Sequence, residues 1–190
     1  MKKLLLLLLA AFLFGCSSGK YDVPDMDFSV EIATRDVDMS GYRGVNSTKH
    51  CFREVDLYDV YDFIKEGGSG VFYLGYTDCA NCQQGVRYLN EVGMELGVTV
   101  YYINIDRADY NIRGDREAYD RVLAELEPIL GKEDDGEVII LTPDVFQLIN
   151  GEFGKNHIGL TGSWEGTSPS EASVNQLKET YRELLTPYIR

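Results

Sequence analysis

From about residue 50 onward, apolar and polar positions form short blocks whose period predicts secondary structure. Compact apolar runs bounded by turn residues predict strands, whereas apolar residues spaced three and four apart predict amphipathic helices. We therefore expect strands at residues 51–55, 71–76, 98–105, 137–141, 145–149 and 153–158, and helices at 57–66, 80–96, 115–130 and 169–188. This alternation predicts one α/β domain whose mixed sheet is covered by helices on both faces.

Local signals mark several element ends. Gly67-Gly68 stops the first helix, because glycine adopts the left-handed conformation of a helix end at little cost. Asn150-Gly151 predicts a tight hairpin between the last two strands. The last helix has the clearest predicted start, with Ser168 as the N-cap, Pro169 at the first position and Glu171 completing a capping box.

The N-terminal residues do not belong to this pattern. Lys2 and Lys3 precede an apolar run, Leu4–Phe14, that is too short to span a membrane as a mature helix. The following Leu13-Phe14-Gly15-Cys16 resembles the lipobox of bacterial lipoproteins, although Phe14 is bulkier than is usual there. That resemblance implies a signal peptide at 1–15 and a lipidated Cys16. The alternative is plain secretion with a free Cys16.

We accordingly expect a lipidated cysteine and tether at 16–48, which wraps the domain in part, and a folded domain at 49–190. The expected location is the extracytoplasmic face of a bacterial membrane, held by the lipid anchor. The formal charge of −13 argues against a nucleic-acid partner, because phosphates would be repelled. Anionic lipid headgroups would be repelled too, so membrane attachment depends on the lipid.

The candidate chemistry lies where the strand at 71–76 meets the next helix, at Cys79-Ala80-Asn81-Cys82. Two cysteines at this spacing bind a metal or cycle between dithiol and disulfide. A structural zinc site needs four ligands, and the chain has no second such pair and only two isolated histidines, His50 and His157. We therefore favour redox chemistry, with no metal and no cofactor.

The element order, with this cysteine pair after a central strand, resembles the thioredoxin superfamily. Asp106 ends the third strand, Thr142-Pro143 stands where the family has its cis-proline loop, and Asn150-Gly151 follows at the hairpin. The resemblance covers residues 52–188 and implies a thioredoxin-like three-layer fold with a mixed central sheet. Among its members, exported and membrane-tethered proteins such as the bacteriocin-transport accessory type are the most similar.

The chain departs from the family pattern beneath the cysteines. The family's buried acid corresponds to Tyr73, and the lysine often paired with it corresponds to Tyr102. The usual device for proton transfer is therefore absent or supplied by another group, such as water. The stretch between Cys79 and Pro143 is also longer than in the minimal fold, with the excess around Arg107–Asp134, which we expect to shape a partner surface.

Cys79 is the expected attacking thiol, because a helix N-terminus favours a thiolate and leaves this first cysteine exposed. Cys82, one turn on, is the expected resolving thiol. The resemblance implies that Thr142 and Pro143 present backbone to an extended substrate. It also places Trp164 beside the same groove, as a substrate platform or as a packing residue.

Cys51 is the odd thiol, and we expect it to be a buried apolar residue; the alternative is a third redox partner. The predicted function is a membrane-anchored thiol–disulfide oxidoreductase. Its expected partners are extracytoplasmic protein thiols or disulfides and a membrane redox partner. The alternative is a redox-inactive accessory lipoprotein with a structural disulfide, and a weaker third is metal delivery with an external ligand.

Overall fold

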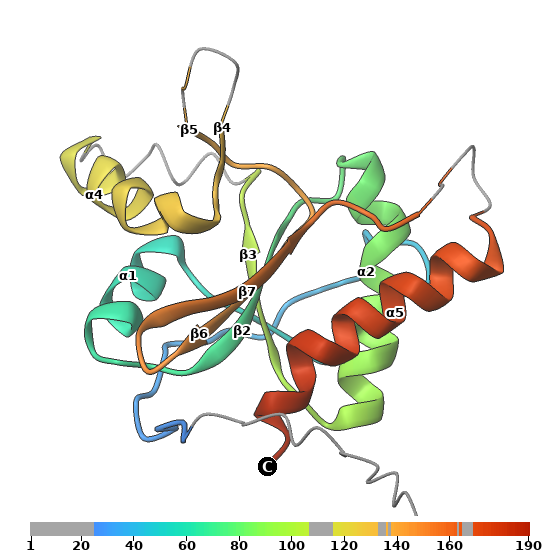
Figure 1. Ribbon diagram of the computed structural model, residues 1–190, viewed down its shortest axis with the longest axis horizontal. Coiled ribbons are helices and arrows are strands. Elements are labelled where there is room, and N and C mark those ends of the chain that lie inside the picture. The colour runs from blue at the N-terminus through green and yellow to red at the C-terminus, as the bar shows by residue number, and fades with distance from the viewer. Residues whose placement is uncertain (1–24, 107–115, 133–135, 137, 163, 165–168) are drawn as a thin grey trace, which may run out of the picture.

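The computed structural model describes residues 25–106, 116–132, 136, 138–162, 164 and 169–190. Figure 1 shows a central sheet between two layers of helices. The strands are β1 (Phe52–Glu54), β2 (Gly70–Gly75), β3 (Val100–Asn104), β4 (Gly131–Lys132), β5 (Val138–Ile139), β6 (Asp144–Ile149) and β7 (Glu152–Ile158). The helices are α1 (Leu57–Lys65), α2 (Ala80–Leu96), α4 (Arg116–Leu126) and α5 (Glu171–Leu185), with short 3₁₀ turns at Glu127–Ile129 and Thr186–Tyr188.

The main sheet has the strand order β1-β3-β2-β6-β7. Strands β1, β3 and β2 are parallel, and β6 and β7 continue the sheet in antiparallel register. The β6–β7 hairpin turns at Asn150 and Gly151, both of which have positive φ. This is the two-residue turn predicted for Asn-Gly, and it fixes the register of the two strands.

Two hydrophobic clusters fill the space on either side of the sheet. One lies under α2 and α5 and includes Tyr73, Val145 and the two cysteines of the pair. The other lies under α1 and α4 and includes Phe72 and Phe146. Because neighbouring strand residues point to opposite faces, the apolar run of β2 supplies both clusters. The predicted thioredoxin-like three-layer fold, with its mixed central sheet, is confirmed.

Two details differ from the sequence prediction. Among the described residues of the strand expected at 137–141, Val138–Ile139 form a strand that pairs with β4 outside the main sheet, whereas 140 and 141 do not. The last helix begins at Glu171, and its N-cap is Ser170, whose side chain accepts from the backbone N–H of Ser173. Ser168, the predicted cap, lies outside the described residues. Ser168 and Ser170 stand on either side of Pro169 and offer the same cap chemistry, so the sequence could not choose between them.

The segment that precedes β1 packs against the domain. Arg35 forms an isolated antiparallel bridge with Glu54 of β1. Further along, Met39, Tyr42 and Val45 are buried in the cluster under α2 and α5. The part of the expected tether between residues 25 and 48 therefore contributes to the core. Across the described part of the chain, no helix is long and apolar enough to cross a membrane.

Candidate redox site

The site begins where the buried strand β2 ends and the chain turns into α2. Cys79 is the N-cap of this helix, with extended backbone, and its sulfur accepts from the backbone N–H of Cys82 at 3.1 Å. A side chain at this position normally offers oxygen to the unpaired N–H groups of the first turn. Here sulfur takes that role, so the helix terminus stabilises negative charge on Cys79.

Cys79 and Cys82 form a disulfide, with their Cα atoms 5.2 Å apart. The two sulfurs are not equivalent. Cys79 keeps 7% of its surface exposed, whereas Cys82 has none and faces the cluster under α2 and α5. A thiolate approaching from solvent can therefore reach only the Cys79 side of the bond.

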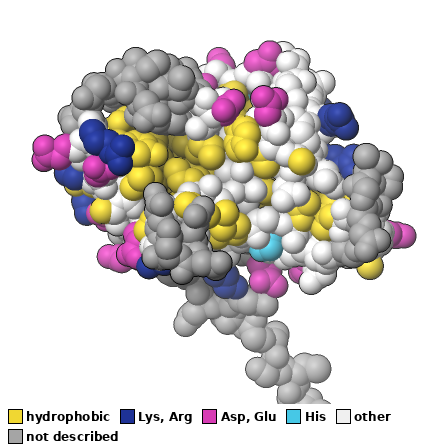
Figure 2. All heavy atoms as spheres, turned by 90° about the horizontal axis from the view of Figure 1, so that it is seen from above, with side chains coloured by type: hydrophobic (Ala, Val, Ile, Leu, Met, Phe, Trp, Pro, Cys, Tyr) yellow, Lys and Arg dark blue, Asp and Glu magenta, His cyan; other side chains and the backbone are white. Residues whose placement is uncertain are grey.

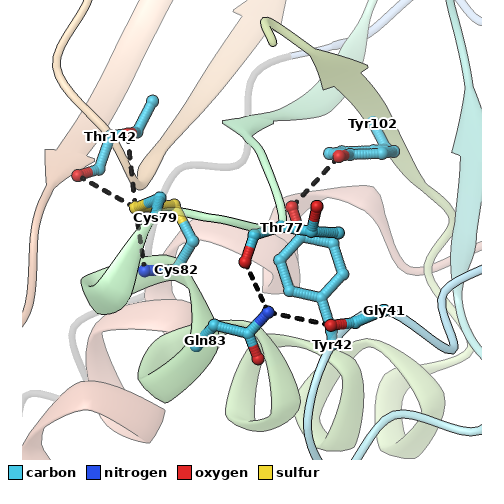
Figure 3. Close-up of a disulfide and its surroundings, with 8 residues drawn as sticks. All are labelled: Gly41, Tyr42, Thr77, Cys79, Cys82, Gln83, Tyr102 and Thr142. Carbon is cyan, nitrogen blue, oxygen red and sulfur yellow. Dashed lines mark hydrogen bonds between the residues drawn. A yellow bond between two sulfur atoms is a disulfide. The ribbon is translucent and has the colours of Figure 1, made fainter.

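The Thr142-Pro143 loop packs against the disulfide, as Figure 3 shows for Thr142. Its peptide bond is cis, as the resemblance implies. The hydroxyl of Thr142 donates to Sγ of Cys79 at 3.4 Å, and its carbonyl oxygen lies 3.8 Å from the same sulfur. The Pro143 carbonyl accepts from the backbone N–H of Gly159 at 2.7 Å, which fixes the loop. Four of the predicted site residues, Cys79, Cys82, Thr142 and Pro143, therefore come together.

Trp164 lies apart from this group. Its indole N–H donates to the carbonyl of Thr161, and its ring meets Tyr88 edge-on at a centroid distance of 6.0 Å. Tyr88 is six residues beyond Cys82 on α2, which corresponds to about 9 Å along the helix axis. The structure thus gives Trp164 a packing contact on α2 next to the 159–162 loop.

Three tyrosines fill the space where the resemblance places an acid and a lysine. The rings of Tyr73 and Tyr102 stack at 5.5 Å, and the hydroxyls of Tyr42 and Tyr102 lie 3.0 Å apart within hydrogen-bond distance. Burial raises the pKa of Tyr73 well above its ordinary value of 10.0, and it raises those of Tyr42 and Tyr102 as well. All three hydroxyls are therefore neutral at physiological pH. Sequence reasoning noted Tyr73 and Tyr102 but missed Tyr42.

Sequence reasoning also missed a buried carboxyl next to the proline loop. Asp144 is 1% exposed, and its Oδ1 has no hydrogen-bond partner among the described residues. Burial raises the pKa of Asp144 to about 8. A hydrogen bond with the Asn156 side chain acts in the opposite direction and lowers the pKa, but its effect is smaller. Because Val145 faces the disulfide cluster, Asp144 points to the other face of the sheet, with Phe146. The available signal was a lone acid after Thr-Pro at the start of an apolar strand.

The third described cysteine is separate from the couple. Cys51 is a free thiol packed against Gly93 of α2, and burial raises its pKa to about 12. It thus remains protonated and shielded, as expected for an apolar packing role. In the parts of the chain that are described, no group of three or more His, Cys, Asp or Glu side chains could hold a metal ion.

Figure 2 shows the molecule from above, the side toward which the β4–β5 ladder points in Figure 1. Hydrophobic side chains gather there on the side of α4, and acidic side chains lie directly beside them. Leu141, which directly precedes Thr142, is 40% exposed. Apolar surface therefore adjoins the loop that contacts the disulfide.

No protein-family model matches the chain, and no curated protein sequence matches it. Among solved structures, it is similar to oxidized thioredoxin O2 from Arabidopsis thaliana, with a TM-score of 0.44 and 14% identity, over 71% of this chain and 95% of that one. It is also similar to oxidized thioredoxin O1 from Arabidopsis thaliana, with a TM-score of 0.40 and 15% identity, over 70% of this chain and 97% of that one. The strand order and connections described above define the fold of this chain as thioredoxin-like.

Proposed function

We propose that this protein is a thiol–disulfide oxidoreductase that acts on protein thiols through the Cys79–Cys82 couple. One observation carries the proposal: the sulfur of Cys79, a residue that is 7% exposed, accepts hydrogen bonds from Cys82 N–H and from the Thr142 hydroxyl, while Cys82 is fully buried. Donors aimed at a sulfur lower the pKa of its thiol and favour the reactive thiolate. A merely structural disulfide needs no such donors.

In the reducing direction, the Cys79 thiolate attacks one sulfur of a substrate disulfide. A Cys79–substrate disulfide forms, and the other substrate sulfur leaves as a thiolate. The Cys82 thiolate then attacks Sγ of Cys79, which closes the Cys79–Cys82 disulfide and releases the second substrate thiolate. Two electrons pass from the couple to the substrate. The reverse sequence oxidises a substrate dithiol, and the relative reduction potentials decide which direction prevails.

We further propose that the protein works outside the cytoplasm, anchored by a lipid on Cys16, and exchanges electrons with a membrane redox partner. Support comes from the basic and apolar run before Cys16 and from the lipobox-like Leu13-Phe14-Gly15-Cys16. Cys16 lies outside the described residues. Compartments outside the cytoplasm also allow disulfides to persist, which suits a protein in which Cys79 and Cys82 are joined as a disulfide.

The extended substrate would bind beside Thr142 and Pro143. The apolar side chains near this loop, including the exposed Leu141, suit contact with an unfolded or extended polypeptide. Trp164 is proposed to border the same surface through the 159–162 loop, next to Tyr88.

Measurement of the reduction potential of the Cys79–Cys82 couple tests the proposal. The full-length chain in detergent is equilibrated with glutathione buffers and alkylated, and the peptide that holds both cysteines is quantified by mass spectrometry. We expect reversible exchange between about −270 and −120 mV, the range spanned by thioredoxin and strongly oxidising relatives. A couple that stays oxidised below about −300 mV would instead indicate the redox-inactive accessory protein.

A further inference from the structure

The segment Met39–Val45, here called the strap, lies beside the N-terminal end of α2 and the turn that precedes Cys79. Met39, Tyr42 and Val45 are buried, and they belong to the same hydrophobic cluster as Cys79 and Cys82. Gly41 and Arg43 alternate with them on the exposed side. The strap therefore belongs to the core cluster that also holds the disulfide.

Gln83, the residue after Cys82, joins the strap to the turn. Its side-chain N–H groups donate to the Gly41 carbonyl at 2.8 Å and to the Thr77 carbonyl at 2.6 Å, as Figure 3 shows. Its side-chain oxygen accepts from the backbone N–H of Arg43 at 3.0 Å. One amide thus connects three segments of the chain: the strap, the turn before Cys79 and the first turn of α2.

The fit between the strap and the turn leaves no space for a side chain at Gly41. A methyl group there would lie 2.8 Å from Cγ2 of Thr77, well inside normal van der Waals contact. Gly41 has no positive φ among the described backbone angles, so its requirement is steric. The strap is thus held against the exposed turn by close contact as well as by Gln83.

The other side of the strap is fixed to the sheet. The Tyr42 ring meets Tyr102 edge-on at 6.1 Å and Tyr73 at 6.4 Å, and its hydroxyl lies 3.0 Å from that of Tyr102. The strap is therefore attached to β2 and β3 through Tyr42, and to the Thr77–Cys79 turn through Gln83.

We infer that Gln83 is a positioning residue of the redox site, through which the strap holds the Thr77–Cys79 turn in the geometry that stabilises the Cys79 thiolate. This inference rests on the proposed function, because a positioned Cys79 thiolate serves thiol–disulfide exchange. Both donors to Cys79 depend on where the turn places Sγ. When the disulfide opens, the side-chain cross-link between Cys79 and Cys82 of α2 is lost, and only the main chain and hydrogen bonds fix the turn against the helix. The Gln83 side chain then remains, with the backbone bond from Gln83 N–H to the Cys79 carbonyl, to hold turn and helix together.

Substitution of Gln83 by alanine leaves two carbonyls without their donor and one backbone N–H without its acceptor. The turn loosens, the Cys79 thiolate loses stabilisation, and its pKa rises. Because the reduced form becomes less stable, the reduction potential falls. We expect about a tenfold change in the exchange equilibrium with glutathione, which corresponds to about 30 mV for a two-electron couple.

Three comparisons make the test specific. Gln84→Ala removes the same side chain one position along α2, where the described residues show no hydrogen bond to its side-chain oxygen, and it is expected to change neither the reduction potential nor the Cys79 pKa. Gly41→Ala should act like Gln83→Ala, because its methyl group pushes the strap off Thr77. Thr77→Ser removes the conflicting Cγ2 atom, so Gly41→Ala/Thr77→Ser should recover the original potential.

The experiment uses the full-length chain in detergent and measures the Cys79–Cys82 potential, the pH dependence of Cys79 alkylation and the melting temperature of each variant. The inference is supported if Gln83→Ala and Gly41→Ala both lower the reduction potential and raise the Cys79 pKa. Adding Thr77→Ser to Gly41→Ala should then restore both values. A lower melting temperature with an unchanged potential and pKa would reduce Gln83 to a structural role and overturn it. If Gln83→Ala does not fold, the Gly41 and Thr77 variants decide.

The same experiment separates this inference from the proposed function. If the original couple fails to exchange with glutathione, the oxidoreductase proposal fails. The inference is then decided by the Cys79 alkylation profile after chemical reduction. Equal profiles for the original chain and Gln83→Ala would overturn it, whereas a Cys79 pKa that is higher in Gln83→Ala than in the original chain would sustain it.

Discussion

The hydroxyl of Thr142 lies 3.4 Å from Sγ of Cys79 and donates to it, although 63 residues separate the two in the chain. The contact exists because β6 pairs with β2, so the loop that leads into β6 meets the turn that leaves β2. The Thr142 side chain therefore affects the charge on the Cys79 sulfur as well as the shape of the surface beside the disulfide.

We predict that Thr142→Val, which keeps the shape of the side chain but removes the donor, raises the pKa of the Cys79 thiol by about one unit. A hydrogen bond to a charged group contributes about 1.5 kcal/mol, and one pKa unit corresponds to about 1.4 kcal/mol. The rate of Cys79 alkylation against pH measures the change. Thr142→Ser keeps the hydroxyl and should behave like the original chain. Identical profiles for valine and serine would show that the hydroxyl does not act on the sulfur.

The buried carboxyl of Asp144 predicts a pH dependence of stability. Its pKa in the folded protein is about 8, above the ordinary 3.8, so between these values the folded state binds more protons than the unfolded state. The free energy of unfolding therefore falls as pH rises from about 4 to about 8, and Asp144 adds no further slope above that. Its contribution to the slope is at most about 1.4 kcal/mol per pH unit.

Asp144→Asn places a neutral side chain of the same shape at this position. We expect it to flatten the pH dependence of denaturant unfolding between pH 5 and 8 and to make the protein more stable than the original at pH 8. Asp62→Asn changes the net charge equally at an exposed position of α1 and serves as the control. If the two asparagine variants show the same slope, Asp144 is already ionised in the folded protein.

The elements that carry the disulfide were predictable because their signals are local. The apolar run of β2, the helical period of α2 and the Asn150-Gly151 turn each depend on residues close in the chain. The strand expected at 137–141 was confirmed at Val138–Ile139 and wrong at 140 and 141, because a short apolar run does not specify its partner. Val138–Ile139 pairs with β4, and the chain reaches the main sheet only after Thr142-Pro143.

The surroundings of the site were predicted less well because they depend on contacts between distant segments. Met39, Tyr42 and Val45 stand as single apolar residues among polar ones, and no period marks them for burial. Gln83 looks like any polar helix residue, since its three hydrogen bonds go to residues 77, 41 and 43. The spacing of Cys79 and Cys82 was enough to predict that they act as a pair. The contacts of the strap with the turn before Cys79 could be recognised only in the structure.

We predict that Cys51 reacts with alkylating reagents only when the protein unfolds. Burial beside Gly93 raises its pKa to about 12, so little thiolate exists at neutral pH and access is blocked. Alkylation of the native chain, followed by mass spectrometry, should show Cys51 unmodified until denaturant is added. Detection of a stable disulfide from Cys51 to Cys79 or Cys82 would contradict both this prediction and the assigned couple.

The unequal exposure of the two paired cysteines predicts a division of labour that can be tested in cells. Cys82→Ser leaves Cys79 able to attack a substrate disulfide but removes the thiol that releases the product. Mixed disulfides with partner proteins should therefore accumulate and disappear on reduction. Cys79→Ser should trap nothing, because the remaining thiol at Cys82 is fully buried and cannot reach a substrate.

Trapped complexes are counted on non-reducing gels after acid quenching, and a Cys51→Ala background excludes the third thiol as their source. The expected asymmetry follows from the N-cap position of Cys79 and the inward position of Cys82, so it tests the geometry and the mechanism together. Equal trapping by both variants would show that either sulfur can reach a substrate. Trapping by neither, in cells where the original couple is reduced and reoxidised, would mean that the exchange partner is not a protein thiol.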